Sequence, residues 1–180
     1  MVGLIRRSFS YLDGELFKKL FTSFVRPHLE YAQAVWHPYL LKHKRIIENV
    51  QIRATKLVDG LKDLSYEERL RKLNLPTLEF RRERGDMIEV YNHIHRYDRN
   101  VISSNFRQQS RPSRKHNFQL VENRPVDGVR GKQFNSFYYR TNRRWNNLSN
   151  KVVDAETVNT FKNHLDAEWE TTPSKYTFDE

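Results

Sequence analysis

The strongest constraint on the fold is the spacing of large apolar side chains near the N-terminus. They recur in adjacent pairs four residues apart: Leu16, Phe17, Leu20, Phe21, Phe24 and Val25. This spacing places them on one face of an amphipathic helix, for which Asp13 is a suitable N-cap residue. Pro27 is expected to kink or end that helix, because proline lacks an N–H and restricts the residue before it.

The rest of the sequence continues the helical pattern, so we predict a mainly α fold, a small helical bundle. Further helices are expected over residues 41–58, 65–73, 78–95, 134–147 and 155–169. Ile46 is expected among the inward residues of the first of these. Ser65 and Glu68 form a capping-box sequence at the start of the second.

The same pattern predicts the domain organisation. Residues 1–96 are expected to form a helical domain, and 97–131, which lack a helical period, a basic and loop-rich linker. Residues 132–170 are expected to form a C-terminal helical segment that packs back on the first domain. Residues 171–180 are expected to fray.

Positive charge is concentrated in the middle of the chain. The 180 residues carry a formal net charge of +10, and the block 107–144 holds ten basic and two acidic residues. Such a block attracts polyanions, because neutralising phosphates releases condensed counterions. A nucleic-acid partner is therefore predicted, and a solvated basic loop without a partner is the alternative.

Many kinds of catalytic site are absent from the sequence. It has no cysteine, which excludes disulfides, thiolate nucleophiles and Cys-ligated metals, and it has no glycine-rich phosphate loop. His93 and His95 would point about 200° apart on a helix and so could not share an ion. We expect no enzyme activity, no cofactor and no small-molecule substrate.

Apolar segments long enough for a membrane or for export are also absent. There is no apolar run of 18 residues and no secretory signal after the N-terminal methionine. We therefore expect an intracellular protein, nuclear or cytoplasmic and not secreted, with no membrane partner.

Three stretches are more specific than composition. The first is FVRPHLEYA at 24–32 with VWHPY at 35–39. The second comprises ENVQIRATKL at 48–57, YEERL at 66–70, LPTL at 75–78, RR at 81–82 and GD at 85–86. The third comprises RWNNL at 144–148, VVDA at 152–155, FK at 161–162 and LD at 165–166.

In order and spacing these stretches resemble the C-terminal region of jockey-like non-LTR retrotransposon reverse transcriptases, over roughly residues 15–170. One departure is Ser149, where the family usually has proline. The resemblance implies a thumb and the region behind it, a helical module that packs on the primer–template duplex in this family. The family holds its two catalytic metals with an Asp-Asp pair, and no such dipeptide occurs in this sequence.

The resemblance therefore implies a non-catalytic fragment of an RNA-directed DNA polymerase. We expect it to grip RNA or an RNA–DNA hybrid through the phosphate backbone, with a palm lying upstream or in a separate chain. The alternative is a helical protein-interaction module left from a decayed mobile element, with no nucleic-acid function.

The candidate nucleic-acid contacts are basic residues in or near these stretches. They are Arg53, Lys56, Arg111, Arg114, Lys115, Arg130, Lys132, Arg140, Arg143 and Arg144. Arg53 and Lys56 are placed on one face with Gln51, for which a plain solvated face is the alternative.

Other arginines and tryptophans are expected to have structural roles. Trp36 and Trp145 are expected in the core rather than as stacking platforms. Arg26 either pairs with Glu30 at i+4 or contacts a phosphate. Arginines of the 78–95 helix are expected to pair with carboxylates of the same helix: Arg81, Arg82 and Arg84 with Glu79, Glu83 and Asp86.

Overall fold

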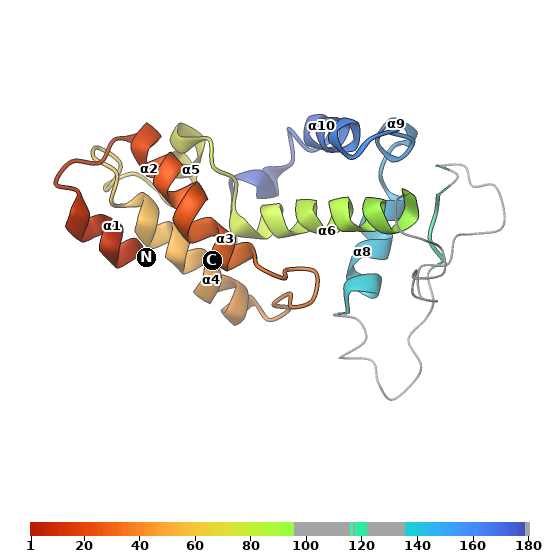
Figure 1. The fold of residues 1–180 in the computed structure, drawn as a ribbon, viewed down its shortest axis with the longest axis horizontal. Helices are drawn as coiled ribbons and strands as arrows, with labels where there is room; N and C mark the ends of the chain where they lie inside the picture. The colour runs from red at the N-terminus through yellow and green to blue at the C-terminus, as the bar shows by residue number, and fades with distance from the viewer. Residues whose placement is uncertain (96–115, 117, 122–135, 179–180) are drawn as a thin grey trace. The chain divides into compact units, whose positions relative to one another are not determined.

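The computed structural model describes residues 1–95, 116, 118–121 and 136–178, and it confirms the mainly helical fold (Figure 1). The chain divides into two compact units. Unit 1 comprises residues 1–82 together with the C-terminal segment from Thr172, and unit 2 comprises residues 83–171. The division falls inside helix α6 (Leu78–His95), whereas the sequence placed a domain boundary after residue 96.

Unit 1 begins with four short helical elements. They are α1 (Val2–Ser8), α2 (Gly14–Leu20), a π-helical turn (Phe21–Val25) and α3 (Arg26–Glu30). The Asp13 side chain caps α2, accepting from the Leu16 amide at 2.8 Å. The last three elements follow one another directly, as Figure 1 shows.

The sequence predicted either a kink or an end of the helix at Pro27. The helical run does not end at Pro27, and a π-helical turn interrupts the regular α-helix just before it. Pro27 lies in the first turn of α3, immediately after the π-helical turn. There the Arg26 amide reaches back five residues to the Phe21 carbonyl. Because of this wider turn, Pro27 does not lie in the interior of a regular α-helix, where its ring would clash with a preceding carbonyl.

The remaining helices of unit 1 are α4 (Leu41–Thr55), α5 (Tyr66–Leu73) and the start of α6. The capping box at the start of α5 is confirmed: the Ser65 amide donates to Glu68 at 2.8 Å, and the Ser65 hydroxyl accepts from the Glu68 amide at 3.3 Å. Gly60, with a φ of +76°, permits the turn between α4 and α5.

The core of unit 1 is built from the apolar faces of these helices. Its buried residues include Phe17, Phe21, Ala54, Val58 and Leu70. Phe17 and Phe21 stack with ring centroids 5.5 Å apart. Ile46 was expected to face inward but is exposed.

The C-terminal segment belongs to unit 1 and is held by specific hydrogen bonds, in contrast to the expected frayed tail. A 3₁₀ turn, η2 (Pro173–Lys175), lies against the start of α6. The buried Thr77 donates its amide to the Lys175 carbonyl and its hydroxyl to the Ser174 carbonyl, both at 2.9 Å. The Tyr176 hydroxyl donates to the Asn74 side chain at 3.1 Å.

Unit 2 contains the rest of α6 with α8 (Phe137–Asn146), α9 (Asn150–Val153) and α10 (Val158–Glu168). Trp145 is fully buried in its core, as predicted, and its indole N–H donates to the Phe118 carbonyl at 2.9 Å. Leu120 is also fully buried, and its amide and carbonyl both bond the Asn146 side chain at 2.9 Å. The described part of the expected 97–131 linker is thus integrated into this core.

Candidate nucleic-acid interface on helix α4

One face of α4 carries a line of basic side chains. They are Lys42, Arg45, Arg53 and Lys56, the last being the C-cap residue. At 100° per residue the four positions fall within an arc of about 80°, and at 1.5 Å per residue they extend over about 21 Å. All four are exposed. We call these four residues the α4 basic face.

No carboxylate shares this face. The one acidic residue of α4, Glu48, lies about 100° around the helix from the centre of this face and is buried. Lys44, which is turned toward α6, pairs with Glu79. Within residues 1–95 and the other described segments, no side chain forms a hydrogen bond or ion pair with the four cations. Their positive charge is therefore available to a ligand.

The buried side of α4 fixes the helix in place. The Glu48 carboxylate accepts from the Tyr66 hydroxyl at 2.5 Å and from the Leu78 amide at 3.0 and 3.1 Å. Burial raises the pKa of Glu48, and the hydrogen bonds from Tyr66 and Leu78 offset part of that shift. These bonds orient α4 so that its basic face points outward.

Gln51 does not lie on the contact face where the sequence placed it. Its side chain is buried and donates to the Pro76 carbonyl at 3.0 Å and to the Tyr66 hydroxyl at 3.1 Å. Arg53 and Lys56 do share an exposed face, but their companions are Lys42 and Arg45. Sequence reasoning missed these two, although positions 42, 45, 53 and 56 follow a helical period.

The arginines of α8 have different surroundings. Arg140 forms a bidentate ion pair with Asp86 of α6 at 2.9 and 3.0 Å, and the Asp86 side chain is only 2% exposed. Arg144 pairs with Glu83, also of α6. Arg143 is exposed and forms no hydrogen bond or ion pair with the described residues. Of these three candidates, only Arg143 is not paired with a described carboxylate of unit 2, so only its charge is available to a ligand.

Arg81 and Arg84 of α6 pair with carboxylates of other helices, which corrects the expectation that they pair within α6. Arg81 pairs with Glu30 of α3, and Arg84 pairs with Asp166 of α10 at 2.5 and 2.8 Å. Arg82 is buried and donates to the Leu29 carbonyl at 2.9 Å. Spacing along one helix could not show these partners, because they come from distant parts of the sequence.

The pairing of Arg26 with Glu30 is present at 3.9 Å. The other predicted contacts, Arg111, Arg114, Lys115, Arg130 and Lys132, lie outside the described residues.

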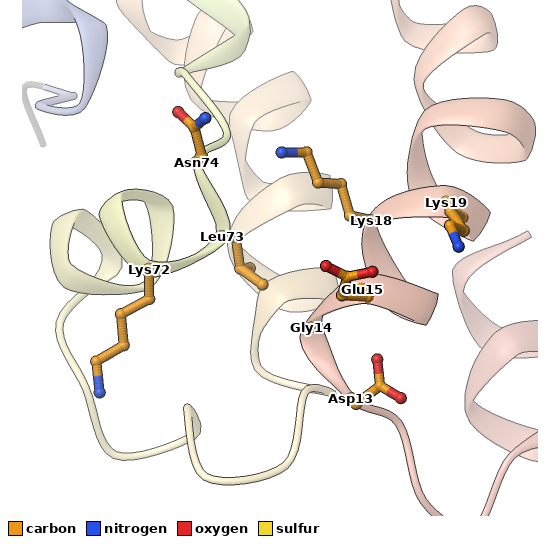
Figure 2. A pocket seen from close by; sticks show the side chains of 8 residues that line it. All are labelled: Asp13, Gly14, Glu15, Lys18, Lys19, Lys72, Leu73 and Asn74. Atoms are coloured by element: carbon orange, nitrogen blue, oxygen red, sulfur yellow. The ribbon is translucent and has the colours of Figure 1, made fainter.

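Figure 2 shows a pocket of unit 1, of about 680 Å³, where the start of α2 meets the end of α5. Its lining carries charges of both signs, with Asp13, Glu15, Lys18 and Lys19 from α2 and its N-cap, and Lys72 from the end of α5. Lys18 extends toward Asn74 across the opening, whereas Lys72 points away from it. The mixed charge makes this pocket a poor match for a polyanion.

A second pocket, of about 450 Å³, lies in unit 2 beside Tyr91, His95 and Thr157 at the start of α10. Burial lowers the pKa of His95. Among the described residues, no group of three histidine or carboxylate side chains could hold a metal ion. Likewise, none of the described helices is long and apolar enough to cross a membrane.

Comparison of the sequence with protein-family models and with curated proteins, and of the structure with solved structures, finds no match. The assignment of function therefore depends on the residues and the geometry described above.

Proposed function

We propose that this chain is a non-catalytic nucleic-acid-binding module, the thumb-like C-terminal part of a reverse transcriptase of the non-LTR retrotransposon type. It grips RNA or an RNA–DNA hybrid through backbone phosphates. The observation that carries this proposal is the α4 basic face, four exposed cations in line without a carboxylate among them. Polymerisation would then require a palm supplied upstream or by a separate chain.

The geometry favours phosphate contact over base readout along α4. Lysine and arginine side chains on one helical face can each neutralise a phosphate, and such contacts position a nucleic acid without reading its sequence. The buried hydrogen bonds of Glu48 and Gln51 hold the helix, so that the cations are presented by a rigid element.

The test is binding of labelled RNA and RNA–DNA hybrid, followed by fluorescence anisotropy at several salt concentrations. The variant replaces Lys42, Arg45, Arg53 and Lys56 by Gln. Because each lost phosphate contact removes about 0.7 to 0.9 from the slope of log K against log salt, the loss of all four should flatten the slope by about 2.8 to 3.6.

A matched control removes the same charge from other exposed positions of unit 1: Arg7, Lys19, Lys62 and Lys72, each replaced by Gln. The control should retain nearly all of the slope. We call the fourfold Gln replacement on α4 the α4 variant. An equal loss of salt slope in the α4 variant and the control would show that net charge alone drives binding. An unchanged salt slope in the α4 variant would show that α4 is not part of the interface.

Primer extension on an RNA template with Mg²⁺ or Mn²⁺ tests the non-catalytic part of the proposal. We expect no incorporation of dNTP above a heat-killed control, because the sequence has no Asp-Asp pair to hold two metals. Template-dependent incorporation would contradict the proposal.

A protein-interaction module is the second candidate. It is favoured by the exposed apolar side chains between α3 and α4, among them Tyr31 and Val35. A protein-docking surface would give RNA no steep salt dependence, so the same titration separates the two candidates.

A further inference from the structure

The turn that joins α3 to α4, residues 31–40, exposes several large side chains. Tyr39 is 59% exposed and Trp36 is 41% exposed, whereas the sequence predicted Trp36 in the core. Exposed aromatic rings in this number are uncommon on a soluble surface and indicate a binding function. They lie directly before the α4 basic face, since Tyr39 precedes Lys42 by three residues, a chain distance of at most about 11 Å.

The turn holds Trp36 in a defined position. The Trp36 indole N–H donates to the Tyr31 carbonyl at 2.6 Å, and the Val35 and Trp36 amides donate to the Ala32 carbonyl at 2.9 and 3.1 Å. Ala32 adopts a left-handed conformation with a φ of +50°, which is costly for a residue with a Cβ. Such strain persists where the surrounding structure enforces it, and it clusters at functional sites.

A buried cation backs the Trp36 ring. The Arg82 guanidinium carbon lies 5.6 Å from the centre of the ring, and the Leu29 carbonyl fixes that guanidinium. The ring is therefore held from one side by a cation–π contact while part of its surface stays open to solvent. An exposed, immobilised ring of this kind loses little conformational freedom when a second planar group stacks on it.

The charge of this region points to a nucleic acid as the occupant. Residues 31–47 contain no Asp or Glu and include the exposed cations Lys42 and Arg45, whereas Lys44 is paired with Glu79. Aromatic rings beside a basic groove are the arrangement by which proteins bind single strands, because every base has a face that can stack. In a duplex these faces are already covered by neighbouring base pairs.

We propose that unpaired bases stack on Trp36 and Tyr39 while the backbone of the same strand follows the α4 basic face. The ligand is thus a nucleic acid with a single-stranded segment. This inference rests on the proposed function, and it adds base contacts that phosphate binding does not require.

The test measures the affinity of the full chain for three ligands of about 12 nucleotides: single-stranded RNA, an abasic strand with the same phosphates, and a duplex. The variants are Trp36→Ala and Tyr39→Ala. Each should bind the base-containing strand about 10-fold more weakly, with unchanged affinity for the abasic strand and the duplex and an unchanged salt slope. Trp36→Phe should retain most of the affinity, because it keeps a ring.

Tyr11→Ala is the matched control, because Tyr11 is an exposed tyrosine of unit 1 outside the turn, and it should leave the affinity for all three ligands unchanged.

If Trp36→Ala fails to fold, the Tyr39→Ala variant tests the inference, since the described residues give the Tyr39 side chain no hydrogen bond to lose. Unchanged binding of the base-containing strand by Tyr39→Ala and, where it folds, by Trp36→Ala overturns the inference. Equal affinity of the wild type for abasic and base-containing strands overturns it as well. If the α4 variant still loses its salt slope in that case, the proposed function stands without base stacking. If the α4 variant also binds normally, both proposals fall, and the apolar turn belongs to a protein-docking surface.

Discussion

Replacing Arg140 by Gln should destabilise unit 2 rather than weaken RNA binding. The Arg140 guanidinium holds both oxygens of Asp86, at 2.9 and 3.0 Å, in a site where the two side chains are 12% and 2% exposed. Removing the arginine leaves the carboxylate buried beside a neutral group. Breaking a buried ion pair from one side costs about 3–5 kcal/mol.

Urea denaturation followed by the fluorescence of Trp145, which is buried in the same unit, measures this loss. Arg143→Gln is the matched control on the same helix, because Arg143 is exposed, and it should change the free energy of unfolding by less than about 0.5 kcal/mol. The double variant Arg140→Met with Asp86→Leu should recover most of the loss, since no charge is then left buried. The shortfall from additivity gives the coupling between the two residues.

The result that would refute this reasoning is specific. An Arg140→Gln variant within about 1 kcal/mol of the wild type would show that the ion pair does not support the fold. If the same variant also lowered the salt slope of RNA binding by about one, Arg140 would belong to the nucleic-acid surface, as the sequence alone predicts.

Three further outcomes are expected. Trp145→Ala should cost unit 2 about 4 kcal/mol in urea denaturation, because it empties a fully buried site, and a loss below about 1 kcal/mol would contradict the assigned core. Gly60→Ala should lower the free energy of unfolding by about 1 kcal/mol in thermal melts through its φ of +76° alone, since an added Cβ meets no atom within 4 Å, and an unchanged or higher melting temperature would contradict this. Burial raises the pKa of Glu48, so the folded chain holds that proton more tightly than the unfolded chain. Its contribution to stability is therefore full below a pH of about 4.5 and is lost as the pH rises through the raised pKa. Glu48→Gln should flatten this dependence in urea titrations at several pH values, and an equally steep profile would show that another group is responsible.

Local sequence signals predicted much of the helical structure. The capping box at Ser65 and the long helix over 78–95 were confirmed, because short-range hydrogen bonds and apolar periodicity determine them. The sequence predicted an irregularity at Pro27 but not its form: a π-helical turn accommodates the proline, and the local sequence carries no signal for such a turn. Helices α1 and α9 were not predicted, since seven and four residues give too little periodicity.

The candidate site was harder to predict, because the partner of a charge depends on tertiary structure. Arg140 and Arg53 are both arginines in helices that the sequence predicted. Arg140 pairs with the buried carboxylate of Asp86, a residue 54 positions away in the sequence, whereas Arg53 faces solvent. Trp36 shows the converse. Its position beside Pro38 and Tyr39 suggests a core residue, yet a strained turn holds it at the surface.

The pairing of Thr77 with the C-terminal segment has a consequence for the order of events during synthesis. Thr77 leaves the ribosome 97 residues before its partner Ser174, an interval of roughly 5–20 s at ordinary elongation rates, and Lys175 follows directly. During that interval the nascent N-terminal helices lack the two hydrogen bonds that Thr77 donates to the C-terminal segment. All of unit 2 emerges meanwhile, so unit 2 can collapse on the ribosome before unit 1 is complete. Loss of the segment from Thr172 onward would therefore destabilise unit 1, although that segment is distant in sequence from the helices of unit 1.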